Sequence, residues 1–128
     1  MKRIFGNLFL LFLVVNLATF SSCNKVAPDD YGIFSAQNDT TSIMNGTINS
    51  KTPQYWENYI TAFSNTKMII MKDCPGSCDD EANLEAARAV KLQNLAIHLP
   101  ADAEIASGAV DFFLAGNVRT REAGSKIG

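Results

Sequence analysis

Basic charge and histidine are both scarce in this sequence of 128 residues. The chain has 11 Lys and Arg residues against 13 Asp and Glu, a formal net charge of −2, and a single histidine, His98. Without a basic surface to contact phosphates, the sequence does not indicate nucleic-acid binding. It also lacks a calcium-loop pattern and a second pair of zinc ligands, so neither a metal nor a cofactor is expected.

Charged residues are absent from a long stretch near the N-terminus. Lys2 and Arg3 form a positive start, and no charge follows from Ile4 through Asn24, which includes a continuous apolar run at residues 8–15. This pattern is typical of an export signal. Because the stretch is near the lower limit of about 17 residues for a membrane span, a signal anchor is the alternative.

The residues after the apolar run favour lipidation. Phe20-Ser21-Ser22-Cys23 resembles a bacterial lipobox, in which small residues stand directly before a cysteine. In proteins with that motif the cysteine is lipidated and becomes the first mature residue. The resemblance implies a signal peptide at residues 1–22 and a membrane anchor through lipid on Cys23. It places the protein in the cell envelope, facing the periplasm or the exterior.

The cysteine count fits this interpretation. Three cysteines are an odd number for an exported protein, but lipidation of Cys23 leaves the pair Cys74 and Cys78. Outside the cytoplasm this pair can oxidise if the loop brings its Cα atoms within about 7 Å. The spacing is one residue longer than the redox CxxC pattern, so the sequence leaves a Cys74–Cys78 disulfide open.

The mature chain divides into a polar tether and one folded domain. Residues 23–41 are polar and are expected to form the tether, and residues 42–128 the domain. The expected elements are strands at 42–48, 67–72 and 95–99, helices from the N-cap Thr52, at 79–92 and after Ser107, and strand pieces at 117–121 and 125–127. This alternation predicts an α/β domain with a largely parallel sheet.

Within these elements, two burial patterns are expected. The short apolar run at 67–72 suits a strand that is buried on both faces of its sheet. In the helix at 79–92, we expect Leu84, Ala87 and Val90 to face inward.

Two loops are expected beyond the carboxyl ends of the parallel strands, where sites form in such sheets. They are residues 73–78 and 100–107. Ser107 lies between small residues at the start of a short apolar helix, where unpaired N–H groups can stabilise an oxyanion. The alternative is that Ser107 only caps this helix, because serine is a favoured N-cap residue.

The order of these motifs resembles the Clp protease and crotonase superfamily. The counterparts are Pro75-Gly76-Ser77, the helix from Asp79, and Ala106-Ser107-Gly108 followed by a buried helix. The similarity is greatest to uncharacterised exported relatives, which carry a run like the one at residues 79–83. It covers about residues 42–128.

The resemblance implies a role for each matching residue. Ser107 would be the nucleophile, and the N–H of Gly108 would be one oxyanion donor. The second donor would come from Gly76 or Ser77. The family often has two glycines in this loop and this chain has one, which leaves the register open.

The general base of the family is missing from this sequence. That base is a histidine on the strand after the buried helix, and the sequence given ends about where that strand begins. The domain is therefore expected to be the N-terminal part of a larger fold, with an open sheet edge that is able to pair with another chain. His98 is expected to be a packed strand residue, and Lys126 is a weaker candidate for the base.

Two functions remain open at this stage. The first is a lipid-anchored serine hydrolase, peptidase-like, that acts on peptide or protein substrates through an acyl-enzyme. The second is a non-catalytic lipoprotein that uses the same fold as a binding module. Crotonase-type thioester chemistry is disfavoured, because coenzyme A is not expected outside the cytoplasm. The fold by itself does not choose between them.

The lipid anchor is testable by substitution. Replacing Cys23→Ser removes the lipidated thiol, and we expect the protein to move from the membrane fraction to the soluble fraction on ultracentrifugation. Cys78→Ser is the control and should stay with the membrane. Membrane retention of Cys23→Ser would instead identify residues 4–24 as an anchor helix.

Overall fold

The computed structural model describes residues 26–128, so the expected signal peptide and Cys23 lie outside the described part. Two sheets and three helices make up the domain. The strands are β1 Phe34–Asn38, β2 Thr41–Met44, β3 Met68–Met71, β4 Asp73–Cys74, β5 Ala96–Leu99, β6 Glu104–Ile105, β7 Val118–Arg121 and β8 Lys126–Ile127. The helices are α1 Thr52–Ala62, α2 Asp80–Leu92 and α3 Gly108–Leu114. Within residues 26–128, no helix is long and apolar enough to cross a membrane.

A strand–strand–helix unit recurs along the chain. The five-stranded sheet has the order β1-β2-β3-β5-β7, and the three-stranded sheet has the order β4-β6-β8. In the units β3-β4-α2, β5-β6-α3 and β7-β8, the first strand therefore joins the large sheet and the second joins the small one. Every pairing is parallel except that of β1 with β2. The expected α/β domain with a largely parallel sheet is confirmed.

The small sheet was not expected from the sequence. Its three strands are only two residues long, so they show no alternation of apolar and polar residues. The successive units begin at Met68, Ala96 and Val118, which are unequally spaced. Because the connecting segments differ in length, the repetition leaves no fixed period in the sequence.

The prediction that the polar tether extends to residue 41 was wrong. β1 lies inside residues 23–41 and forms an antiparallel hairpin with β2. Its Phe34 is buried and packs edge-on against Trp56, with ring centroids 5.0 Å apart. The hairpin turn is held by Asn38 Oδ1, which accepts a hydrogen bond from the Thr40 N–H at 2.9 Å. Only Phe34 of the five β1 residues is buried, so the strand has no apolar pattern.

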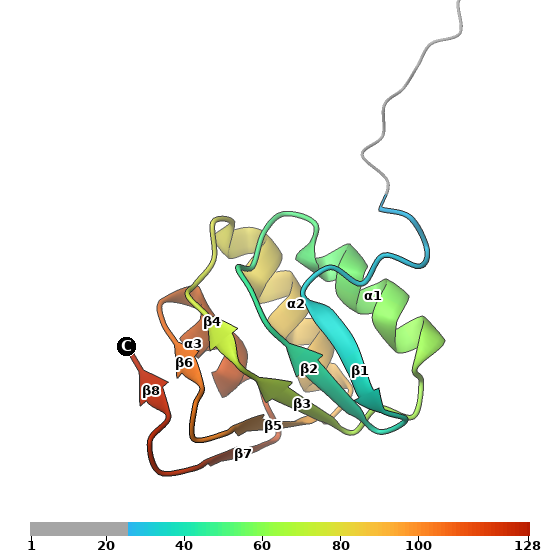
Figure 1. Ribbon diagram of the computed structural model, residues 1–128. Coiled ribbons are helices and arrows are strands. Elements are labelled where there is room, and N and C mark those ends of the chain that lie inside the picture. The colour runs from blue at the N-terminus through green and yellow to red at the C-terminus, as the bar shows by residue number, and fades with distance from the viewer. Residues whose placement is uncertain (1–25) are drawn as a thin grey trace, which may run out of the picture.

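The helices cover one face of the large sheet, as Figure 1 shows. Alternate residues of β3 and β5 are fully buried in this core, namely Ile69, Met71, Ile97 and Leu99. Residues on the other face, such as Ile70 and His98, are only half-buried. The expectation that β3 is buried on both faces was therefore wrong. β7 lies at the edge of the large sheet with all four residues exposed, and its pairing with another chain stays a prediction.

Two details of the helices also differ from expectation. Thr52 is the first residue of α1 rather than its cap, and its Oγ1 accepts a hydrogen bond from the Asn49 N–H at 2.9 Å. In α2, Ala87 and Val90 are buried as expected, but Leu84 is 61% exposed. The buried stripe of α2 instead includes Asn83, one position before Leu84, and a step of one residue on a helix turns a side chain to a different face.

Candidate functional site

The loops after β4 and β6 lie against each other. A Cβ placed on Gly76 would be 3.1 Å from the Ser107 Cβ and 3.6 Å from its Oγ. A Cβ placed on Gly108 would clash with Ser77 Oγ and would be 2.9 Å from Ser77 Cβ. Only glycine permits such a close approach at residue 108, because any side chain would push the loops apart. The structure therefore brings together Ser107, Gly108, Gly76 and Ser77.

Ser107 has a backbone conformation that serine rarely adopts. Its φ is 51° and its ψ is −132°, in the region that favours glycine. Such a conformation costs on the order of 1–3 kcal/mol and persists only where the surroundings enforce it. Ser107 occupies the N-cap position of α3, but its side chain makes no cap hydrogen bond, and the residue is exposed. The hydroxyl is not used to hold the helix.

Backbone contacts on both sides fix Ser107. Its N–H donates to the carbonyl of Gly128 at 3.1 Å, and its carbonyl accepts from the Val110 N–H at 2.8 Å. The Gly128 N–H in turn donates to the Ile105 carbonyl at 2.9 Å. Pairing of β8 with β6 therefore helps to enforce the strained conformation.

The N–H of Ser77 points toward the segment that carries Ser107. On one side of the loop, the Gly76 carbonyl accepts from the Ile48 N–H at 3.0 Å. The described residues contain no cis peptide bond, so the Ser77 N–H lies opposite that carbonyl and points away from Ile48. The other side is occupied by the segment after β6, where the Ala106 N–H donates to the Cys74 carbonyl at 3.1 Å.

The N–H of Gly108 is the second donor at this place. Gly108 is the first residue of α3, and the first N–H groups of a helix have no acceptor within the helix. Among residues 26–128, neither the Gly108 N–H nor the Ser77 N–H donates a hydrogen bond to another backbone group. Two unpaired donors thus lie in the two loops that meet at Ser107.

Asn83, which no sequence pattern singled out, contacts Gly108 from helix α2. The residue is 2% exposed, and its Nδ2 donates to the Gly108 carbonyl at 2.8 Å. Ser77 is tied to the same helix, because its Oγ donates to Asp80 Oδ1 at 2.8 Å. The sequence feature that could have identified Asn83 is an amide side chain among the alanines on the buried face of α2.

Cys74 and Cys78 are both free, so the disulfide that the sequence left open is not formed in this structure. The Cys74 thiol contacts the Met44 carbonyl at 3.6 Å, and the Cys78 thiol contacts the Ile48 carbonyl at 3.5 Å. Cys74 is buried in the core, and this burial raises the pKa of its thiol to about 11. Cys78 is exposed.

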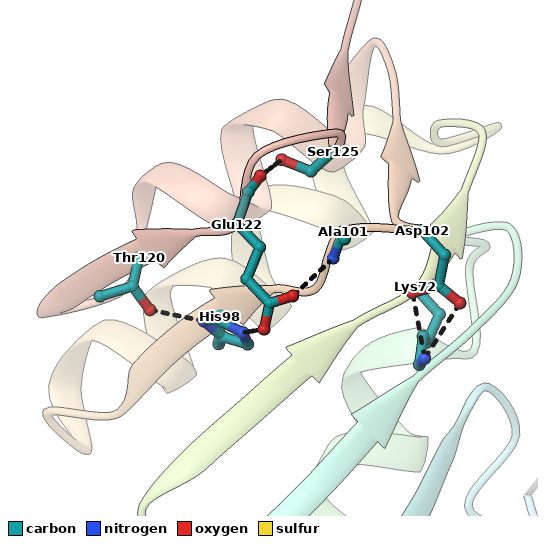
Figure 2. A network of polar contacts seen from close by, with 7 residues as sticks. All are labelled: Lys72, His98, Ala101, Asp102, Thr120, Glu122 and Ser125. Atoms are coloured by element: carbon teal, nitrogen blue, oxygen red, sulfur yellow. Dashed lines mark hydrogen bonds and ion pairs between the residues drawn. The ribbon is translucent and has the colours of Figure 1, made fainter.

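Neither candidate base contacts Ser107. As Figure 2 shows, His98 lies between Thr120 of β7 and Glu122, the residue after β7, with Nδ1 2.7 Å from Thr120 Oγ1 and Nε2 3.1 Å from Glu122 Oε1. Glu122 Oε2 also accepts from the Ala101 N–H at 3.1 Å. The hydrogen bond from His98, and secondly that from Ala101, lower the pKa of Glu122. His98 is therefore bonded to polar groups rather than simply packed.

Lys126 is engaged elsewhere as well. Its Nζ forms an exposed ion pair with Glu104 Oε2 at 3.1 Å across the small sheet.

Within the described part of the chain, no group of three or more His, Cys, Asp or Glu side chains is placed to hold a metal ion. The site thus consists of a hydroxyl and two backbone donors.

Comparison with known proteins identifies the fold. No protein-family model and no curated protein matches the chain. A solved structure does match: the membrane-bound stomatin-specific protease 1510-N, a lysine-to-alanine mutant in complex with a substrate peptide. The TM-score is 0.53 at 22% sequence identity, over 70% of this chain and 42% of that chain. The chain thus spans less than half of that protease, and it has a Clp protease/crotonase-like α/β fold.

The two thiols should differ sharply in reactivity. With iodoacetamide at pH 8, we expect alkylation of Cys78 in the native protein and alkylation of Cys74 only after denaturation, because the buried thiol is almost entirely protonated and shielded. Mass spectrometry of the two cysteine-containing peptides measures this. A Cys74–Cys78 disulfide, or equal alkylation in the native state, would contradict the structure.

Proposed function

We propose that this chain carries the nucleophile and oxyanion site of a lipid-anchored serine hydrolase of the peptidase type, attached to the cell envelope through Cys23. The observation that supports this most strongly is the Ser107 hydroxyl, which is exposed, makes no cap bond and stands on a strained backbone beside two unpaired N–H groups. Strain of this kind concentrates at functional sites. The likeness of fold to a protease is consistent with the proposal.

In this proposal, Ser107 Oγ attacks the carbonyl carbon of a peptide or ester. The carbonyl oxygen becomes an oxyanion and accepts hydrogen bonds from the N–H groups of Ser77 and Gly108. Each such donor contributes on the order of 3 kcal/mol to stabilisation of the transition state. Collapse of the tetrahedral intermediate expels the protonated leaving group and forms acyl-Ser107, which water then hydrolyses.

The direction of its N–H favours Ser77 over Gly76 as the second donor. The Gly76 carbonyl is bonded to Ile48, which turns the Ser77 N–H toward the Ser107 side. Gly76 has a different role, because its φ of 142° allows the loop to turn and its missing side chain leaves room for Ser107. Both residues of the loop are then needed, one as donor and one as spacer.

A base must take the proton of Ser107, because serine is a weak nucleophile without one. His98 is bonded to Thr120 and Glu122, and Lys126 to Glu104. We therefore propose that the base is a group other than these two, supplied by a longer form of the chain or by a partner. Because neither His98 nor Lys126 is placed to act as the base, the structure also favours a second candidate function, a lipoprotein that binds a peptide at these loops without cleaving it.

Labelling with a fluorophosphonate probe distinguishes the two functions. In its native membrane, where a longer form of the chain or a partner can supply the base, the protein should be labelled, and Ser107→Ala should lose the label, since the probe bonds only to an activated hydroxyl. Ser64→Ala, at an exposed turn after α1, is the matched control and should be labelled like the wild type. Absence of label on the wild type, or equal label on Ser107→Ala, would contradict the hydrolase and favour the binding module.

A further inference from the structure

We infer that Asn83 is a positioning residue that sets the place and direction of the Gly108 N–H donor. This inference rests on the proposed function, since it assigns Asn83 to the same oxyanion site. Asn83 does not reach the Ser107 hydroxyl itself. It acts through the backbone of Gly108, whose carbonyl accepts from Asn83 Nδ2 at 2.8 Å.

Two side chains crowd the position that a Cβ of Gly108 would take. That Cβ would lie 2.9 Å from Asn83 Nδ2 and 2.9 Å from Ser77 Cβ. Any shift of Gly108 in this direction meets Asn83 or Ser77. The hydrogen bond to Asn83 also prevents Gly108 from moving away.

Helix α2 therefore fixes both proposed donors. Asp80 accepts from the Ser77 hydroxyl at 2.8 Å, and Asn83 donates to the Gly108 carbonyl at 2.8 Å. Residues three apart lie on the same face of a helix, so the two contacts have a rigid spacing. The distance between the two N–H groups is thus set by one turn of α2 rather than by the flexibility of two loops.

The unused half of the Asn83 amide argues against a purely structural role. Its Oδ1 is buried and has no hydrogen-bond partner among the described residues. A buried acceptor without a partner lowers stability, so packing at this position would be served better by an apolar side chain of similar volume. What an apolar side chain cannot supply is the hydrogen bond to the Gly108 carbonyl.

The test separates rate from stability with Asn83→Leu. This variant keeps the branched shape of the side chain at a somewhat larger volume, and it removes both the bond to Gly108 and the unpaired Oδ1. We expect a melting temperature equal to or above that of the wild type. In the full-length protein, the inactivation rate at saturating fluorophosphonate should fall about 10- to 100-fold, the effect of displacing a catalytic group by about 1 Å. The probe concentration that gives half of the maximal inactivation rate should be unchanged.

Val90→Ala is the matched control, because Val90 is fully buried on the same helix about two turns beyond Asn83. It should lower the melting temperature and leave the inactivation rate of the folded protein unchanged. If Asn83→Leu is inactivated at the wild-type rate, the inference is overturned. If Asn83→Leu and Asn83→Ala both fail to fold while Val90→Ala folds, Asn83 is structural and the inference is overturned as well.

Failure of the proposed function gives a different result. In that case the wild type is not labelled, or Ser107→Ala is labelled equally. The inference is then decided by the amide NMR resonances of Gly108 and Ser77. A shift of both in Asn83→Leu, with neither shifted in Val90→Ala, supports the positioning role. Unchanged resonances in Asn83→Leu overturn it.

Discussion

The contact between the β4–α2 and β6–α3 loops is the constraint on which the rest of this site depends. It requires two positions without side chains, Gly76 beside Ser107 and Gly108 beside Ser77. Parallel pairing of β4 with β6 delivers both loops to one edge of the small sheet, and the missing side chains let the backbones touch. A methyl group at Gly108 would clash with Ser77 and push the two loops apart.

Elements on three sides maintain this contact. The pairing of β8 with β6 brings the Gly128 carbonyl to the Ser107 N–H, and this bond opposes relaxation of the strained serine. Helix α2 holds Ser77 through Asp80 and Gly108 through Asn83. The His98, Thr120 and Glu122 network joins β5 to the end of β7, and so steadies the segment that leads into β8 (Figure 2). Under the proposed function, these contacts would hold the two oxyanion donors in place, and proton transfer would fall to a group other than His98 and Lys126.

The fold class and the meeting of the β4–α2 and β6–α3 loops could be predicted from the sequence. The fold class follows from local sequence patterns, and the meeting of the loops follows from the parallel order of the strands. The apolar runs of β3 and β5, the helix at 79–92 and the turn at Gly76 each carry a clear signal, and parallel strands must end at the same edge. Weak signals account for what was missed. The two-residue strands of the small sheet and the single buried residue of β1 are too short to show a period. The contacts of Asn83 and His98 link distant segments, which residue spacing cannot reveal.

A crystal structure of the Ser107 phosphonate adduct tests the central claim most directly. The phosphoryl oxygen of the adduct occupies the position of the oxyanion, so it reports which groups donate to it. The account predicts that this oxygen lies about 2.9 Å from the backbone nitrogens of both Ser77 and Gly108. An adduct whose oxygen faces solvent, or bonds to neither nitrogen, would contradict it.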